Sequence, residues 1–273
     1  MKRILMSFCI LTAAAGIARG QDIVVTTSVI SSVVKDITGD RIRVETLVPS
    51  GSCPGHFDLN VRHLRLMEKT GILFAHGFEE YLEDIRRSVR NPGFTVSIIR
   101  VEGNWLVPAS QREAYEKTAK ILSGMFPEHA GYFDKNMKDA EAAIDRTDRA
   151  IKTLIKEKRI SGLKVACNDH ISEMLEYMGF AVAATYGRQE ELTPPLVRKL
   201  INTCRKENVR LVIDNLQAGP DTGKIVSGEL GIPHLAISNF PGVFPGTSTL
   251  RETLYENARR IVTVYEKFKN QVD

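Results

Sequence analysis

The sequence predicts an α/β protein made of two parallel-sheet lobes that are joined by one long helix. Short apolar segments alternate with amphipathic segments along most of the 273 residues, which is typical of parallel sheets with helical crossovers. A continuous apolar stripe at helical spacing separates the two halves. We therefore expect two Rossmann-like lobes, a rigid helix between them, and a ligand cleft where the lobes face each other.

In the first half, the expected strands are short apolar runs, and the expected helices are apolar on one face. The run at 41–47 alternates apolar and polar residues, as a half-buried strand does. The run at 72–75 is apolar throughout and is followed by His76. The expected strands are 23–27, 41–47, 72–75 and 95–99, and the expected helices are 29–37, 61–69 and 78–87.

The connecting helix is predicted by apolar residues that recur at spacings of three, four and seven. They form one stripe over roughly seven turns, with charged residues on either side, and Gly162 is expected to end the helix. The stripe consists of Phe133, Met137, Ala140, Ile144, Ile151 and Leu154. We expect an N-terminal lobe at 21–128, the helix at 129–159 and a C-terminal lobe at 160–273.

The second half repeats the alternation of strands and helices. A final amphipathic stretch from Thr249 to about Lys267 is expected to form the last helix. The expected strands are 164–166, 181–185, 209–213 and 234–237, and the other expected helices are 171–178, 196–206 and 219–230.

Residues 1–20 have the features of a cleaved signal peptide. Lys2 and Arg3 precede an apolar stretch at 4–17, and small residues around Arg19 form a cleavage site. The stretch is too short for a membrane anchor, and Cys9 lies in its middle, which disfavours lipid attachment. The signal predicts export to the periplasm.

Composition indicates a globular protein and argues against nucleic acid as a partner. The chain is 43% hydrophobic and 26% charged, unlike a disordered segment. Removal of Lys2, Arg3 and Arg19 with the signal would lower the formal net charge from +4 to about +1. A nearly neutral chain gives no electrostatic basis for binding nucleic acid.

A Cys-x-x-His pattern occurs once in each half, at Cys53/His56 and at Cys167/His170. Thiolate and imidazole are the usual ligands of zinc and of softer transition metals, and two intervening residues allow both side chains to reach one ion. Because export places the cysteines in an oxidising compartment, Cys53 and Cys167 have three alternative roles: metal ligands, a disulfide, or inert buried residues. Cys204 lies in a helix-like stretch and is interpreted as a buried apolar residue.

Further polar residues stand where the predicted strands end. Ligands of open α/β sheets bind outside the carboxyl ends of the strands, so these residues are candidates for lining the cleft. For His76, a ligand role and a structural role remain equal alternatives, whereas His63, His129 and His234 are interpreted as surface or structural residues. The candidates are Cys53, His56, His76, Asn104, Cys167, Asn168, His170, Asp214, Asn215 and Asn239.

The sequence does not favour an enzyme. It contains no Ser-His-Asp elbow, Walker loop or Gly-x-Gly-x-x-Gly turn. Cys167 with His170 would be the candidate thiol nucleophile, and Cys53, His56 and His170 would be the candidate ligands of a catalytic zinc. We predict a binding protein without catalytic residues.

Several segments together resemble the zinc/manganese solute-binding proteins of metal ABC transporters, the cluster A-I or TroA-like family. The resemblance covers nearly all of the chain after residue 20 and includes the predicted connecting helix. It implies an interlobe metal site, transport through an ABC permease and a monomeric receptor related to adhesins. The segments that carry it are 24–28, 33–34, 39–40, 47–51, 103–108, 190–194 and 212–215.

The chain departs from this family at every position where the family holds its metal. Glycine offers no side chain, and an amide supplies no charge, so the usual bare-ion site does not carry over. The family's ligand positions fall on Gly55, Gly103, Asn168 and Asn239.

Two alternatives follow from these departures. In the first, Cys53, His56, Cys167 and His170 form a new site in the interlobe cleft, with His76 as a fifth member, and this ligand set favours zinc or copper(I) over manganese. In the second, the cleft binds a metal chelate or another small ligand through its asparagines, including Asn104 and Asn215. A periplasmic metallochaperone or an adhesin remains a further alternative to the transport receptor.

Overall fold

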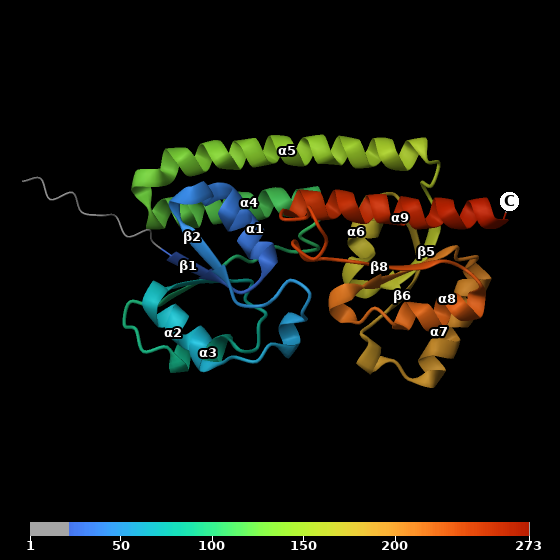
Figure 1. Ribbon diagram of the computed structural model, residues 1–273, viewed down its shortest axis with the longest axis horizontal. Coiled ribbons are helices and arrows are strands. Elements are labelled where there is room, and N and C mark those ends of the chain that lie inside the picture. The colour runs from blue at the N-terminus through green and yellow to red at the C-terminus, as the bar shows by residue number, and fades with distance from the viewer. Residues whose placement is uncertain (1–21, 273) are drawn as a thin grey trace, which may run out of the picture.

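The structure is a computed structural model that describes residues 22–272, and it contains two four-stranded parallel sheets covered by helices (Figure 1). This confirms the predicted α/β class with a long helix between two sheets. The predicted signal peptide at 1–20, with Cys9, lies outside the described residues. No helix within 22–272 is long and apolar enough to cross a membrane.

The first sheet has the strand order β2-β1-β3-β4, and every pair in it is parallel. The order reverses beside β1, so the loops after β1 and β3 leave a crevice at the carboxyl ends of these strands. The strands are β1 (Asp22–Val25), β2 (Arg43–Thr46), β3 (Ile72–Ala75) and β4 (Thr95–Ile98), and the helices are α1 (Ser28–Thr38), α2 (Val61–Thr70) and α3 (Leu82–Ser88).

The second sheet repeats this topology with the order β6-β5-β7-β8. Its order reverses beside β5, which places a second crevice after β5 and β7. The strands are β5 (Lys164–Asn168), β6 (Ala181–Tyr186), β7 (Leu211–Asn215) and β8 (His234–Ile237), and the helices are α6 (Ser172–Tyr177), α7 (Pro194–Glu207) and α8 (Thr222–Leu230).

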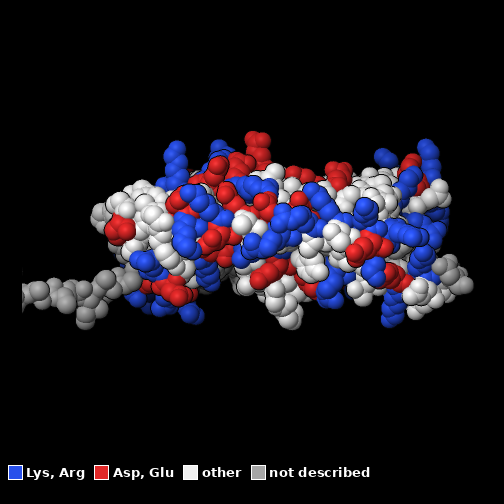
Figure 2. Space-filling model, turned by 90° about the horizontal axis from the view of Figure 1, so that it is seen from above, with Lys and Arg blue, Asp and Glu red and all other residues white. Residues whose placement is uncertain are grey.

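Helix α5 (Ala130–Glu157) is the predicted connecting helix, and it runs along one side of both sheets (Figure 1). Phe133, Ile144 and Ile151 of the predicted stripe are buried in the core. The helix ends at Glu157 with Lys158 as its C-cap, and Arg159 adopts a positive φ of 54°, so the chain leaves the helix before Gly162. On this face of the molecule, Lys and Arg are interspersed with Asp and Glu (Figure 2), including pairs such as Lys135 with Asp139.

Helix α4 (Pro108–Met125) is not among the helices expected from the sequence. It begins with a proline at its first turn, a position where the missing N–H is not needed. Its buried face includes Gln111 and Thr118 beside Tyr115, so its apolar stripe is weak. The helix packs against α1 and α5 and completes the layer beneath α5.

The last helix, α9 (Leu250–Val272), joins the two halves a second time. It packs against α5, and the backbone N–H of Leu250 donates to the hydroxyl of Ser32 on α1. One buried apolar cluster therefore extends from the first sheet to the second. The lobe boundaries at 128 and 160 stay a prediction, because α9 belongs to the second half in sequence and contacts the first.

Candidate ligand site between the two sheets

A cavity of about 600 Å³ lies between the two sheets, beyond the carboxyl ends of their strands. It is placed where the strand orders predict a ligand site. The residues of interest that line it are Cys53, Gly55, His56, His170, Arg188, Asn215, Gln217 and Asn239.

Cys53 and His56 reach this cavity from the loop after β2. The short 3-10 turn η2 (Pro54–His56) is closed by a hydrogen bond from the His56 N–H to the Cys53 carbonyl at 3.1 Å. The His56 side chain is 66% exposed, and its Nε2 lies 3.8 Å from a carboxylate oxygen of Glu190. The imidazole is therefore mostly exposed, with one carboxylate beside it.

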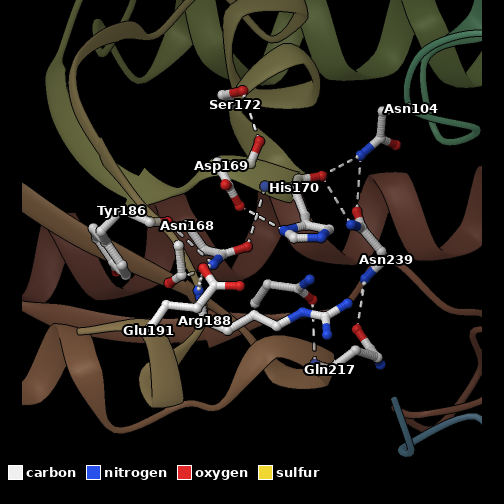
Figure 3. A network of polar contacts seen from close by, with 12 residues as sticks. Asn104, Asn168, Asp169, His170, Ser172, Tyr186, Arg188, Glu191, Gln217 and Asn239 are labelled. Atoms are coloured by element: carbon white, nitrogen blue, oxygen red, sulfur yellow. Dashed lines mark hydrogen bonds and ion pairs between the residues drawn. The ribbon is translucent and has the colours of Figure 1, made fainter. Parts of the chain in front are cut away.

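His170 enters the cavity from the opposite side, after β5. The Asn168 side chain accepts a hydrogen bond from the His170 N–H and fixes the turn η4 (Asp169–Ile171). The Nδ1 of His170 lies 2.5 Å from the Asp169 carboxylate (Figure 3), and no hydrogen bond engages its Nε2 within 22–272. A carboxylate on one ring nitrogen orients the other toward an incoming group, as it does for many metal-binding histidines.

Cys167 does not reach the cavity. Strand β5 continues through Cys167 and Asn168, two residues beyond the predicted end, and Cys167 pairs with Ile213 in the middle of the sheet. Its side chain lies in the apolar core with no exposed surface, and burial raises the pKa of its thiol to about 12. The structure thus separates Cys167 from Cys53, and all three described cysteines are free.

His76 follows β3, as predicted, but its imidazole is held by the protein. Its Nε2 lies 2.8 Å from the Thr27 hydroxyl, and its ring stacks on Phe78 and meets the edge of Trp105. The Glu79 carboxylate accepts a hydrogen bond from the backbone N–H of His76 at 2.9 Å. The ring lines a smaller neighbouring cavity of about 300 Å³, together with His170 and Asn104.

Burial gives this imidazole a strongly shifted titration. Its exposed fraction is 7%, and desolvation lowers the pKa of His76 to about 4, although the nearby Glu79 carboxylate acts in the opposite direction. His76 is therefore neutral at pH 7. Within the described residues its Nδ1 has no hydrogen-bond partner.

Asparagines connect the two halves at one edge of the cavity (Figure 3). The Asn104 side-chain amide donates to the His170 carbonyl and to the Asn239 side chain, each at 2.9 Å. The Asn239 amide donates to the same His170 carbonyl, also at 2.9 Å. Asn104 also donates its backbone N–H to Glu173 at 2.6 Å. These bonds hold the loop after β4 directly against the turn after β5.

Gly103 is adapted to this contact. Its φ of 76° lies in the left-handed region, and a Cβ at this position would come within 2.6 Å of the Glu173 carboxylate. A larger residue would therefore displace the loop from Glu173 and disturb the Asn104 contacts.

Two of the predicted cleft residues lie inside the second sheet. Asn168 is buried and donates to the carbonyls of Tyr186 and Gly187. Asp214 is fully buried and accepts hydrogen bonds from the Tyr186 hydroxyl and the Gly223 N–H, with the His234 ring 2.7 Å away. Both side chains are bonded within the second half because β5 and β7 extend beyond their predicted ends.

Arg188 and Gln217 line the cavity but were not predicted. Arg188 follows β6, and Gln217 follows β7, so the strand-end rule would have identified both had these strands been extended to their true ends. The Gln217 side-chain amide donates to the Ser50 carbonyl, and its oxygen accepts from the Asn239 N–H. Gln217 thus forms a second direct link between the halves.

The described residues contain no group of three His, Cys, Asp or Glu side chains that are placed to hold a metal ion. Cys53, His56 and His170 share one cavity, whereas His76 and Cys167 lie elsewhere.

The cysteine environments predict selective reaction with iodoacetamide. Cys53 is partly exposed, whereas Cys167 and Cys204 are buried, and burial raises the pKa of Cys204 to about 11. Because the thiolate is the reactive form, the native protein at pH 8 should be alkylated at Cys53, and the other two cysteines only after unfolding. Peptide mass spectrometry measures each site separately. Native-state alkylation of Cys167 as fast as that of Cys53 would contradict its core position.

Comparisons with known proteins agree with the architecture. A curated relative, the manganese ABC transporter substrate-binding lipoprotein PsaA of Streptococcus anginosus, is 22% identical over 243 residues, which cover 77% of each chain. The metal ABC transporter substrate-binding lipoprotein FimA of Streptococcus parasanguinis is 20% identical, with 82% of each chain covered.

Solved structures have the same fold. A cadmium-bound periplasmic metal binding protein from candidatus liberibacter asiaticus superposes with a TM-score of 0.76 at 16% identity, covering 90% of this chain and 99% of that one. A crystal structure of ZnuA gives a TM-score of 0.76 at 15% identity, with the same coverage. The family model described as "Zinc-uptake complex component A periplasmic" matches residues 23–264. This match spans most of the chain, and the protein therefore belongs to the periplasmic zinc-uptake complex component A family.

Proposed function

We propose that this protein is an extracytoplasmic solute-binding receptor that delivers a transition metal to the permease of an ABC transporter. Its family and the names of its relatives support this role. The observation that carries the proposal is the cavity between the sheets, into which His56 and His170 project from opposite halves of the chain.

The residues of the cavity favour zinc as the metal. Cys53, His56 and His170 offer sulfur and nitrogen ligands, which suit zinc or copper(I), whereas manganese prefers oxygen. Asp169 adds the carboxylate partner that would orient His170 on an ion. Relatives are named for manganese as well as zinc, so the metal is assigned here from the ligand types alone.

The predicted signal at 1–20 supports export, and the names of the relatives include lipoproteins and periplasmic proteins. Lipoproteins of this kind and periplasmic proteins both function outside the cytoplasm. We propose that the receptor acts as a periplasmic monomer without catalytic activity.

A second candidate cargo is a metal held in a small chelate. Within 22–272 no cluster of three metal ligands is assembled, and a cavity of about 600 Å³ has the size of a small-molecule site. In this version His56 and His170 complete the coordination of a metal whose other ligands come from the chelator.

Removal of either cavity histidine is expected to weaken metal binding at least ~10-fold, since each would supply a ligand on one side of the cleft. The measurement is a zinc titration by calorimetry on the native chain, His56→Ala and His170→Ala. Elemental analysis of the protein isolated from its own compartment identifies the metal that it carries in the cell.

His63→Ala is the matched control. His63 lies on α2 outside the cavity, where its ring accepts a hydrogen bond from the Asn60 N–H. Its removal should leave zinc affinity unchanged. If His56→Ala and His170→Ala also bind zinc like the native chain, the two histidines are not ligands.

A further inference from the structure

The cavity contains one cationic side chain whose charge the protein does not neutralise. Arg188 is half-buried on the loop after β6, and it is the only Lys or Arg among the described residues that line the cavity. Its backbone N–H is bonded to Glu191. No hydrogen bond or ion pair engages its guanidinium within residues 22–272, and no dashed line reaches this group in Figure 3.

The acidic residues near Arg188 are engaged elsewhere or lie beyond ion-pair distance. Glu79 accepts hydrogen bonds from the Thr26 hydroxyl and from the N–H groups of His76 and Gly77. Glu190 lies beside His56, and Glu80 is exposed. Within residues 22–272, no carboxylate oxygen lies within 4.0 Å of a nitrogen of the Arg188 guanidinium. Burying an uncompensated charge is costly, and arginine in such places usually faces a carboxylate or phosphate.

The surroundings leave room for an oxyanion beside this guanidinium. Gly55 lies directly opposite, and a Cβ there would be 3.6 Å from a guanidinium nitrogen. A Cβ there would already be in van der Waals contact with the guanidinium, so glycine leaves this side of the cation uncovered. Asn215 lines the same space, and its side-chain nitrogen donates no hydrogen bond within the described chain. The cavity thus offers one ligand two kinds of hydrogen-bond donor, the charged guanidinium of Arg188 and the neutral amide of Asn215.

We propose that Arg188 binds a carboxylate group of the cargo, so that the ligand is a small polycarboxylate, either free or as the chelator of the metal. This inference rests on the proposed function and names its substrate class. In the chelated form, the carboxylate meets Arg188 while the metal lies within reach of His56 and His170.

The test uses three probes on the full receptor: citrate, zinc ion, and an equimolar zinc–citrate mixture, each titrated by calorimetry. The native chain will prefer one of the two citrate-containing probes. We expect Arg188→Gln to bind that probe roughly 10- to 100-fold more weakly than the native chain does, because a hydrogen bond from a charged donor is lost. Arg188→Lys should lose less affinity for this probe, because lysine keeps the positive charge but cannot donate two parallel hydrogen bonds to a carboxylate. The affinity for zinc ion alone should not change.

Arg198→Gln is the matched control, because it makes the same change of charge at an exposed position on α7 outside the cavity. It should bind all three probes like the native chain. Tighter binding of zinc–citrate than of citrate identifies the metal chelate as the cargo, and equal binding identifies the free acid.

Two results would overturn the inference. If Arg188→Gln and Arg198→Gln bind the citrate probes equally, the guanidinium does not recognise the carboxylate. If the native chain binds neither citrate probe, the substrate class is wrong. Retained zinc binding in either case leaves the metal receptor in place, whereas absence of zinc binding as well removes both proposals.

Discussion

Asp36→Ala is expected to lower the free energy of unfolding by about 3 kcal/mol, the cost of leaving a largely buried charge without its partner. The Asp36 carboxylate on α1 accepts hydrogen bonds from the Arg251 guanidinium on α9 and from the Tyr115 hydroxyl on α4, each at 2.5 Å. Only about a fifth of the Asp36 and Arg251 side chains is exposed, at 19% and 22%. Removal of the carboxylate leaves both donors without this acceptor.

Urea denaturation followed by circular dichroism measures this loss. Asp139→Ala is the control, because its ion pair with Lys135 on α5 is exposed on both sides, where water and salt screen it, and its removal should leave the stability nearly unchanged. The double variant Asp36→Ala/Arg251→Ala should lose less than the two single variants combined, since it also removes the unpaired guanidinium. An Asp36→Ala chain as stable as Asp139→Ala would show that this cluster does not hold α9 to the first half.

Much of the fold could be predicted because local patterns determine it. Strands β3 and β8 lie at 72–75 and 234–237, the residues predicted from their apolar runs and the flanking turn residues. The stripe on α5 is equally direct, because a long helix repeats its signal over many turns. Helix α4 was not predicted, because buried Gln111 and Thr118 interrupt the apolar face by which an amphipathic helix is identified in a sequence.

The position of the cavity was also predictable, but not all of its residues. Parallel strands place their following loops on one edge, and His56, His170 and Asn239, which were chosen from predicted strand ends, line the cavity. The ends of fully buried strands are poorly marked, because both faces are apolar and periodicity is lost. Strand β5 therefore continues through Cys167 into the core, although the Cys-x-x-His spacing indicated a loop.

Arg188 illustrates what one sequence cannot provide. The role proposed for it depends on its guanidinium having no carboxylate partner within residues 22–272, and this environment is created by several loops that folding brings together. Asp36, Tyr115 and Arg251 likewise meet only in space, from helices separated by long stretches of chain. Neither arrangement has a local signature.

Acidification below pH 7 is expected to destabilise the native chain through His76. Burial lowers the pKa of this imidazole to about 4, whereas in the unfolded chain it stays near the ordinary 6.5. Between these values the unfolded chain binds a proton that the folded chain rejects, so the free energy of unfolding falls as the pH falls. The stabilisation is fully present above about pH 6.5 and is lost progressively toward pH 4, up to ~3 kcal/mol in all.

Urea titrations of the native chain and of His76→Gln at several pH values from 7 to 4 isolate this contribution from the carboxylates that titrate in the same range. Glutamine retains a nitrogen that can reach the Thr27 hydroxyl, now 2.8 Å from the imidazole, but it does not titrate. The difference in unfolding free energy between the two chains should therefore shrink as the pH falls. If the stability of His76→Gln runs parallel to that of the native chain over the whole pH range, the His76 imidazole is solvated in the folded protein.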